Sequence, residues 1–268
     1  GTPEVDSWIR DWFDPCVIDE LSVIKDRCLK LEDQKSRELA LLAMSSIIVT
    51  VSRQDSDTRY VRKEKKILPG DTFKRFSSAL DEAVRKQIEL SSEIPGNVTS
   101  TVISGNILEE IDCPAFDLLV CSPPYPNAFS YHLYHRSRML WLDMDPAPFK
   151  KEEIGSHRKY SSKGKNAATK ETFSDELRKI LSWVSGKLRS GRHACFVLGD
   201  STIKGKAVKN DELLIEIAED IGFSLEANIN RNLQATKKSF NPKIGKIKDE
   251  HIVILRNDTE VNDAKPGM

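Results

Sequence analysis

The chain has 268 residues, of which 39% are hydrophobic, so it can form one large domain or a core domain with a helical appendage. Its 41 basic and 41 acidic residues give no net charge, so a surface for a polyanion would have to come from the distribution of charge. No apolar run approaches the roughly 20 residues that span a bilayer, and the N-terminus lacks a signal-peptide pattern, so we expect a cytoplasmic protein without a membrane anchor.

The first third of the chain has the pattern of amphipathic helices. Apolar residues three and four positions apart, with charges between them, occur in SWIRDWFDPCVIDELSVIKDRCLKL, SRELALLAMSSIIVTVS and FKRFSSALDEAVRKQIELS. We therefore expect an all-helical N-terminal segment over residues 1–96.

After residue 96, short apolar runs alternate with helical segments. The runs typical of strands are VTSTVISG, FDLLVC, HACFVLG, LEANINR and HIVILRN, and helices are expected near 132–142, 172–188 and 209–221. This alternation predicts a largely parallel, two-faced α/β sheet. We place that domain at residues 97–256 and expect a flexible tail over residues 257–268.

One of these runs, FDLLVC, leads directly into Ser122-Pro123-Pro124-Tyr125. Ligands of open α/β sheets bind beyond the carboxyl ends of the strands. Because proline has no N–H group, the two prolines predict a stiff loop that offers mostly hydrogen-bond acceptors. Such a loop suits an exocyclic amino group, with its hydrogens on the Ser122 oxygen and the Pro123 carbonyl, while Tyr125 offers a ring on which an extruded base can stack.

The SPPY stretch resembles the catalytic motif of the S-adenosylmethionine-dependent amino-group DNA methyltransferases, in the serine form typical of the branch that modifies N4 of cytosine. VTSTVISGNILEEIDCPAFDLLV is similar to the family's strand, turn and strand before that motif. The likeness implies cofactor contacts at Gly105, Asn106 and Ser122, although Asn106 stands where the family usually has an acidic residue.

The resemblance continues downstream of the motif and covers about residues 98–256. NAFSYHLYHRSRMLWL resembles the helix after the catalytic loop, and LRSGRHACFVLGDSTIKGK resembles a later strand with its Gly-Asp-Ser turn. In the simpler interpretation, Asp200 of that turn only caps a helix or closes the turn. EHIVIL resembles the closing strand. The resemblance implies a partial Rossmann-like methyltransferase sheet.

This sequence does not contain the glycine-rich loop with which that family binds its cofactor. None of the 13 glycines forms its Phe-x-Gly-x-Gly sequence. Since little sequence follows EHIVIL, we expect the loop before residue 1 or on a second subunit, and the helical segment then resembles an insertion between the two halves. The resemblance thus implies the catalytic half of a split or truncated enzyme, in a restriction-modification or defence setting.

Two segments concentrate positive charge. HRKYSSKGKNAATK (157–170) and KKSFNPKIGKIK (237–248) each hold five basic residues and no acidic one. We expect both to be loops that contact the phosphate backbone of DNA, or, in the simpler interpretation, solvated lysine loops. The candidate DNA contacts are Lys159, Lys163, Lys165, Lys237, Lys238, Lys243 and Lys246.

The expected reaction is direct transfer from the cofactor to the flipped base, without a covalent intermediate or a metal. Strand alternation directs Cys121 away from the Ser122 site. The five cysteines are scattered, and His132 and His135 lack a third ligand, so we expect no metal site. Two alternatives stay open: a catalytically inactive methyltransferase-like subunit that binds DNA or a partner, and an amino-group methyltransferase acting on RNA. Adenine N6 also remains open as the methylated position.

Overall fold

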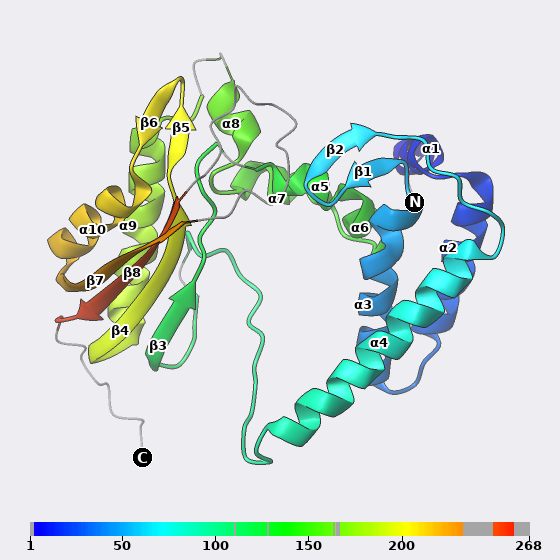
Figure 1. The fold of residues 1–268 in the computed structure, drawn as a ribbon, viewed down its shortest axis with the longest axis horizontal. Coiled ribbons are helices and arrows are strands. Elements are labelled where there is room, and N and C mark those ends of the chain that lie inside the picture. The colour runs from blue at the N-terminus through cyan, green and yellow to red at the C-terminus, as the bar shows by residue number, and fades with distance from the viewer. Residues whose placement is uncertain are drawn as a thin grey trace. The chain divides into compact units, whose positions relative to one another are not determined.

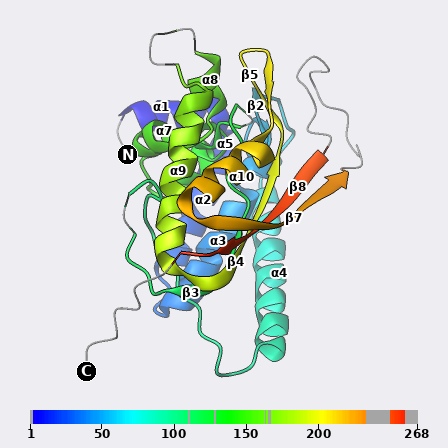
Figure 2. The same ribbon diagram turned by 90° about the vertical axis from the view of Figure 1, so that its left-hand side faces the viewer.

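The computed structural model describes residues 3–109, 111–127, 129–162, 164, 167–232 and 249–259 (Figures 1 and 2). The chain forms two compact units, one of Gly1–Thr101 with Tyr131–Lys151 and one of Val102–Ser130 with Glu152–Met268. The first unit is mainly helical and the second holds a mixed β-sheet. The protein is therefore an α/β protein with helices at its N-terminus, as the sequence predicts.

The first unit packs its helices around one apolar core. Its elements are α1 (Pro3–Trp12), α2 (Pro15–Leu29), α3 (Gln34–Val51), α4 (Asp71–Glu93), α5 (Tyr131–Tyr134), α6 (Arg136–Trp141) and nearly all of α7 (Pro146–Glu152). The apolar residues at three- and four-residue spacing form the core, which includes Phe13, Val17, Leu21, Met44 and Ile48. Packing of these amphipathic faces stabilises the helices, as is usual for helices of this length.

A short antiparallel hairpin corrects the expectation that this segment is all-helical. Strand β1 (Gln54–Ser56) pairs with β2 (Arg59–Arg62). The Gln54 side chain is fully buried, and its amide donates to the carbonyls of Ser56 at 2.9 Å and Tyr134 at 3.2 Å. Strands of three and four residues held by a buried polar side chain have no apolar period that a sequence pattern could reveal.

The second unit is built on a four-stranded sheet in the order β3-β4-β8-β7. Its strands are β3 (Phe116–Cys121), β4 (Leu188–Gly199), β7 (Phe223–Asn232) and β8 (Asp249–Asn257). Strands β3 and β4 are parallel, whereas β8 pairs antiparallel with both β4 and β7. The expectation of a largely parallel sheet is therefore wrong: β3, β4 and β7 share a direction, as strand–helix alternation predicts, but β8 runs against them between β4 and β7.

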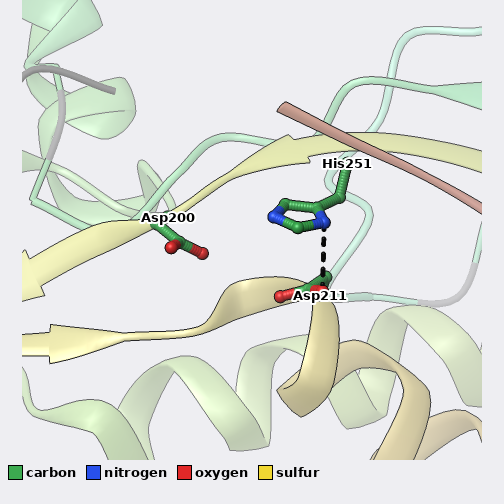
Figure 3. Close-up of side chains that lie close together, drawn as sticks. All are labelled: Asp200, Asp211 and His251. Carbon is green, nitrogen blue, oxygen red and sulfur yellow. Dashed lines mark ion pairs between the residues drawn. The ribbon is translucent and has the colours of Figure 1, made fainter. Parts of the chain in front are cut away.

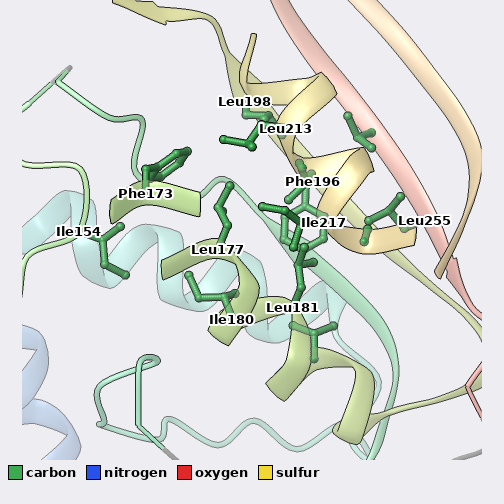
Figure 4. Close-up of a cluster of buried hydrophobic side chains, with 14 of the residues drawn as sticks. Ile154, Phe173, Leu177, Ile180, Leu181, Phe196, Leu198, Leu213, Ile217 and Leu255 are labelled. Carbon is green, nitrogen blue, oxygen red and sulfur yellow. The ribbon is translucent and has the colours of Figure 1, made fainter. Parts of the chain in front are cut away.

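Helices α9 (Lys170–Lys187) and α10 (Asn210–Ile221) cover one face of this sheet (Figures 1 and 2). Leu177 and Leu181 of α9 and Ile217 of α10 meet Phe196 of β4 and Leu255 of β8 in the core (Figure 4). The α8 helix (His157–Ser161) and a small hairpin of β5 (Ser201–Ile203) and β6 (Lys206–Val208) complete the described elements. Because successive strand residues alternate between faces, the core above fixes which side of each strand is buried.

The stretch 98–105, expected as a strand, has no regular structure. Val102 is 96% exposed, and no strand within the described part of the chain pairs with this segment. A strand is stable only when its backbone groups pair and one of its faces is buried, so the β-branched residues here do not suffice. The helices expected near 132–142, 172–188 and 209–221 are confirmed as α5 and α6, α9, and α10. Among the described helices none has the length and apolarity to cross a bilayer.

Candidate active site

The Ser122–Tyr125 loop begins directly after β3, at its carboxyl end. Strand β3 pairs in parallel with β4, with Cys121 opposite Phe196, so the carboxyl ends of both strands lie at the same edge of the sheet. Ser122 is exposed, Pro123 is buried, and Pro124 and Tyr125 are half-buried. The serine hydroxyl is thus accessible at the edge where ligands of such sheets bind.

Tyr125 is held by the two strands beside its loop. Its hydroxyl lies 3.4 Å from the Val197 carbonyl of β4, to which it donates, and 3.5 Å from Glu250 Oε1 of β8. Its ring packs against the core of the second unit, and Glu250 also forms an ion pair with Arg231 at 3.5 Å. A half-buried ring with an anchored hydroxyl has a defined orientation, which suits a stacking surface.

Gly155 packs directly against the backbone of the loop. A Cβ atom on this residue would lie 2.7 Å from the Tyr125 carbonyl oxygen and 3.4 Å from Pro124 Cβ, and its φ is +72°. The Gly155 carbonyl accepts a hydrogen bond from the Asn127 N–H at 2.9 Å. Only glycine combines this left-handed backbone with so close an approach, so Gly155 determines where the loop lies.

Asn127 fixes the far end of the loop. It has a positive φ of 62°, which asparagine tolerates better than most residues. Its side-chain amide donates to the Thr202 carbonyl at 2.5 Å, and its Oδ1 lies 2.8 Å from His157 Nδ1. Because Oδ1 can only accept, His157 Nδ1 is the donor in this contact. Sequence reasoning did not single out Gly155, Asn127 or His157; the polar turn after the prolines was the available signal.

Cys121 lies on the core side of β3, as strand alternation predicts. Its side chain packs against the second unit's core, and burial raises the pKa of its thiol. A thiol with a raised pKa stays protonated at neutral pH, so it is a poor nucleophile. The geometry therefore favours Ser122 over Cys121 as the functional side chain of this loop.

Of the two residues predicted to contact a cofactor, Asn106 begins a turn that the Glu109 N–H closes on the Asn106 carbonyl at 2.9 Å, and Gly105 precedes that turn. Asn106 Oδ1 accepts from the Leu108 N–H at 3.1 Å, and its amide nitrogen donates to Glu109 at 3.3 Å. The segment that follows forms one wall of a groove of 1120 Å³ along α9, lined by Ile107, Leu108, Ile111, Arg178 and Trp183 among others. Both polar groups of the Asn106 side chain are thus engaged within its own turn.

The predicted DNA contacts fall mostly outside the described residues: Lys163, Lys165, Lys237, Lys238, Lys243 and Lys246. Lys159 lies on α8, where its ammonium donates to the Glu153 carbonyl at 2.6 Å. It also lies near Glu176, whose pKa is raised by burial. A phosphate group would have to compete with these contacts for Lys159.

Three side chains that the sequence did not connect converge in the second unit (Figure 3). Asp200 follows β4 directly, Asp211 lies in the first turn of α10, and His251 lies in β8; one ligand atom of each lies within 4.8 Å of the others. His251 Nδ1 is 3.1 Å from Asp211 Oδ2, to which the Asn228 amide also donates at 2.9 Å. The Lys209 ammonium bonds Asp200 Oδ2, and this hydrogen bond raises the pKa of Lys209. The one sequence signal was the position of Asp200 just past a strand.

A scan of protein-family models and a search of curated proteins find no match to this chain. Among solved structures the chain is similar to a protein of Thermus thermophilus that carries the name DNA modification methylase, with 16% identity over 61% of this chain and 55% of that one, at a TM-score of 0.34. The structure of that protein complexed with S-adenosyl-L-methionine aligns with 21% identity over 37% of this chain and 41% of that one, at a TM-score of 0.27. This chain thus spans about half of the length of the structures it matches.

Proposed function

We propose that this chain carries the catalytic, target-binding half of an S-adenosylmethionine-dependent methyltransferase. The enzyme acts on the exocyclic amino group of a flipped DNA base, and the preferred candidate for this group is N4 of cytosine. The observation that carries the proposal is the SPPY loop at the carboxyl end of β3, with an exposed Ser122 and a Tyr125 anchored to β4 and β8. We also propose a restriction-modification or defence setting, which the resemblance of the motif implies.

The roles of the loop residues follow from the chemistry of an amino group on an aromatic base. Its nitrogen lone pair is delocalised into the ring, which makes the nitrogen a poor nucleophile. Acceptors on both hydrogens, the Ser122 oxygen and the Pro123 carbonyl, favour a tetrahedral nitrogen with a localised lone pair. Tyr125 stacks on the flipped base and holds it in place. When bound, S-adenosylmethionine supplies an electrophilic methyl group.

The cofactor site requires more than this chain's described residues. Asn106 replaces an acidic side chain and is engaged with Leu108 and Glu109. Strand β3 is the edge of the described sheet, and its Leu118 and Val120 are 61% and 70% exposed on the face opposite the core. An apolar edge strand is a template for a further strand. These features support a proposal that a second polypeptide, or another segment of a longer chain, continues the sheet at β3 and brings the glycine loop.

This arrangement has a measurable consequence for cofactor affinity. A small ligand binds tightly only when several groups converge on it, and this chain supplies one wall. The chain alone should therefore bind S-adenosylmethionine in the high micromolar range or more weakly, by calorimetric titration. Tight binding by the chain alone would show that a segment of residues 1–97 completes the site.

A catalytically inactive DNA- or partner-binding subunit is the second candidate, and the engaged Asn106 side chain favours it. Nucleoside mass spectrometry separates the candidates. The chain is co-expressed with the reading frame next to its own, and DNA and RNA are digested to nucleosides. We expect N4-methylcytosine in DNA. N6-methyladenine would change the base and keep the reaction, a methylated RNA nucleoside would change the substrate, and DNA binding without methylation would support the inactive subunit.

A further inference from the structure

Two buried carboxylate oxygens in the cluster of Asp200, Asp211 and His251 have no hydrogen-bond partner among the described residues. These atoms are Asp200 Oδ1 and Asp211 Oδ1. The Asp211 side chain is only 6% exposed, so bulk water does not solvate it. Leaving a buried acceptor unsatisfied costs about 1–3 kcal/mol, and more when the group is charged. No described residue satisfies these two oxygens, so a ligand bound between them would remove this cost.

The histidine of the cluster is oriented as metal-binding histidines are. Asp211 Oδ2 can only accept a hydrogen bond, so His251 Nδ1 carries the proton in the neutral ring, and the lone pair is on Nε2. Figure 3 shows the ring edge away from Asp211 turned toward Asp200. A histidine that donates one N–H to a carboxylate has a fixed tautomer and a more basic second nitrogen, which is the usual arrangement at metal centres.

The negative charge of the two carboxylates in the cluster favours binding of a cation. Two carboxylates lie together, and the ammonium of Lys209 bonds only Oδ2 of Asp200. Asn228 likewise occupies Oδ2 of Asp211. The two Oδ1 atoms and one imidazole nitrogen thus remain, and their side chains offer ligand atoms within 4.8 Å of one another. Atoms that share one ion at about 2 Å each lie at most about 4 Å apart, so the three side chains would close slightly around a bound ion.

We propose that Asp200, Asp211 and His251 bind a divalent transition-metal ion, with Zn²⁺ and Mn²⁺ as the best matches. Two carboxylates and an imidazole form a mixed oxygen and nitrogen set without a thiolate. An all-oxygen set would favour Mg²⁺ or Ca²⁺, whereas the imidazole shifts the preference toward zinc and its neighbours. The proposal departs from the sequence-based expectation of no metal site.

Two simpler explanations account for part of the cluster. The N-terminus of α10 favours a negative charge at Asp211, but it does not explain why Asp200 and His251 lie beside it. A buried water could donate to both free oxygens, but it would add no positive charge to that of Lys209. A bound cation would satisfy both oxygens, accept the imidazole lone pair and offset negative charge at the same time.

The site would join three segments that are distant in the sequence: the end of β4, the start of α10 and the start of β8. His251 follows Glu250, whose carboxylate lies 3.5 Å from the Tyr125 hydroxyl. The bound ion would therefore stabilise the strands that anchor the SPPY loop. This role is structural and does not depend on whether the loop transfers methyl groups.

The test is metal binding by the purified chain after treatment with EDTA. Calorimetric titration with Zn²⁺ and with Mn²⁺, and the visible absorption of added Co²⁺, should show about one ion per chain and an increase in melting temperature. Asp211→Asn, Asp200→Asn and His251→Gln should each weaken binding by about 100-fold or more, since even loss of a group behind a ligand costs 10- to 100-fold. Glu216→Gln, an exposed carboxylate on the same helix, should bind as the wild type does.

The outcomes separate a built site from adventitious binding. Absence of stoichiometric binding by folded wild-type chain would overturn the proposal, and so would binding that survives in the His251→Gln and Asp200→Asn variants. Circular dichroism shows whether each variant folds. Should Asp211→Asn fail to fold, Asp200 is the better probe because it is partly exposed, and its variant together with His251→Gln decides the question.

Discussion

Replacing Gly155 with alanine tests how the SPPY loop is positioned. The added Cβ would lie 2.7 Å from the Tyr125 carbonyl oxygen and 3.1 Å from its carbon, both of them backbone atoms that cannot rotate away. The substitution also places a side chain at a φ of +72°. We expect the loop to move off Gly155 and the Asn127–Gly155 hydrogen bond to break.

The size of the effect is the sum of two costs. An alanine in the left-handed region costs roughly 1–2 kcal/mol, and overpacking against a rigid neighbour typically costs about 1–3 kcal/mol. Gly155→Ala should therefore reduce the free energy of unfolding by about 2–5 kcal/mol. Gly191→Ala is the matched control, because its φ is also +72° and nothing lies within 4 Å of its Cβ position. This control should lose only the first cost, about 1–2 kcal/mol.

Urea denaturation followed by circular dichroism measures both losses, and hydrogen exchange with mass spectrometry locates them. Gly155→Ala should increase amide exchange over residues 122–130, including Asn127, whereas Gly191→Ala should not. Equal destabilisation by the two substitutions, with unchanged exchange at the loop, would show that Gly155 does not support Tyr125 as the structure indicates.

Three further predictions concern the surroundings of the site. Asn127→Ala removes the donor to the Thr202 carbonyl and should lower the free energy of unfolding by about 1–2 kcal/mol in urea. Glu176→Gln should raise the melting temperature at pH 7 by about 2 °C, because burial raises the pKa of this carboxyl. The folded protein holds that proton more tightly than the unfolded chain, so wild-type stability falls as pH rises from the ordinary carboxyl pKa to the folded one. The advantage of the glutamine should therefore vanish in scans near pH 4. Lys163→Glu combined with Lys165→Glu should weaken DNA binding in a filter-binding assay. The decrease of log affinity with log salt concentration should become shallower by about two units of slope, and an unchanged slope would place the DNA surface elsewhere.

Strands of the second unit could be predicted where the local sequence determines that a strand forms and where it ends. FDLLVC and HACFVLG contain the uninterrupted apolar runs LLVC and ACFVL, and the helices between the strands show clear three- and four-residue spacing. The end of β3 was predictable as well, because Pro123 and Pro124 cannot donate to the strand ladder. The direction of β8 was not, since alternation of side chains is the same in parallel and antiparallel strands. Residues 98–105 show the reverse error, where β-branched residues occur without a partner strand.

Several residues of the site could not be predicted from the sequence, because they lie far apart in the chain and meet only in the folded structure. Asp200, Asp211 and His251 meet only because β8 lies beside β4 and α10 begins close to the end of β4, and no spacing along the chain indicates this. The requirement for glycine at position 155 could not be predicted for the same reason, because it arises from the close contact with the Tyr125 backbone. The SPPY loop could be recognised because its four residues are contiguous.

The central claim, that Ser122 holds the target amino group, is tested most directly by transfer of a labelled methyl group from S-adenosylmethionine to DNA. The chain is assayed together with the polypeptide that supplies the glycine loop, and Ser122→Ala is compared with wild type. Ser92→Ala, an exposed serine on α4, is the control. We predict that Ser122→Ala lowers the rate by at least about 10- to 100-fold, with folding unchanged, because a positioned acceptor is lost. A wild-type rate in Ser122→Ala would contradict the account.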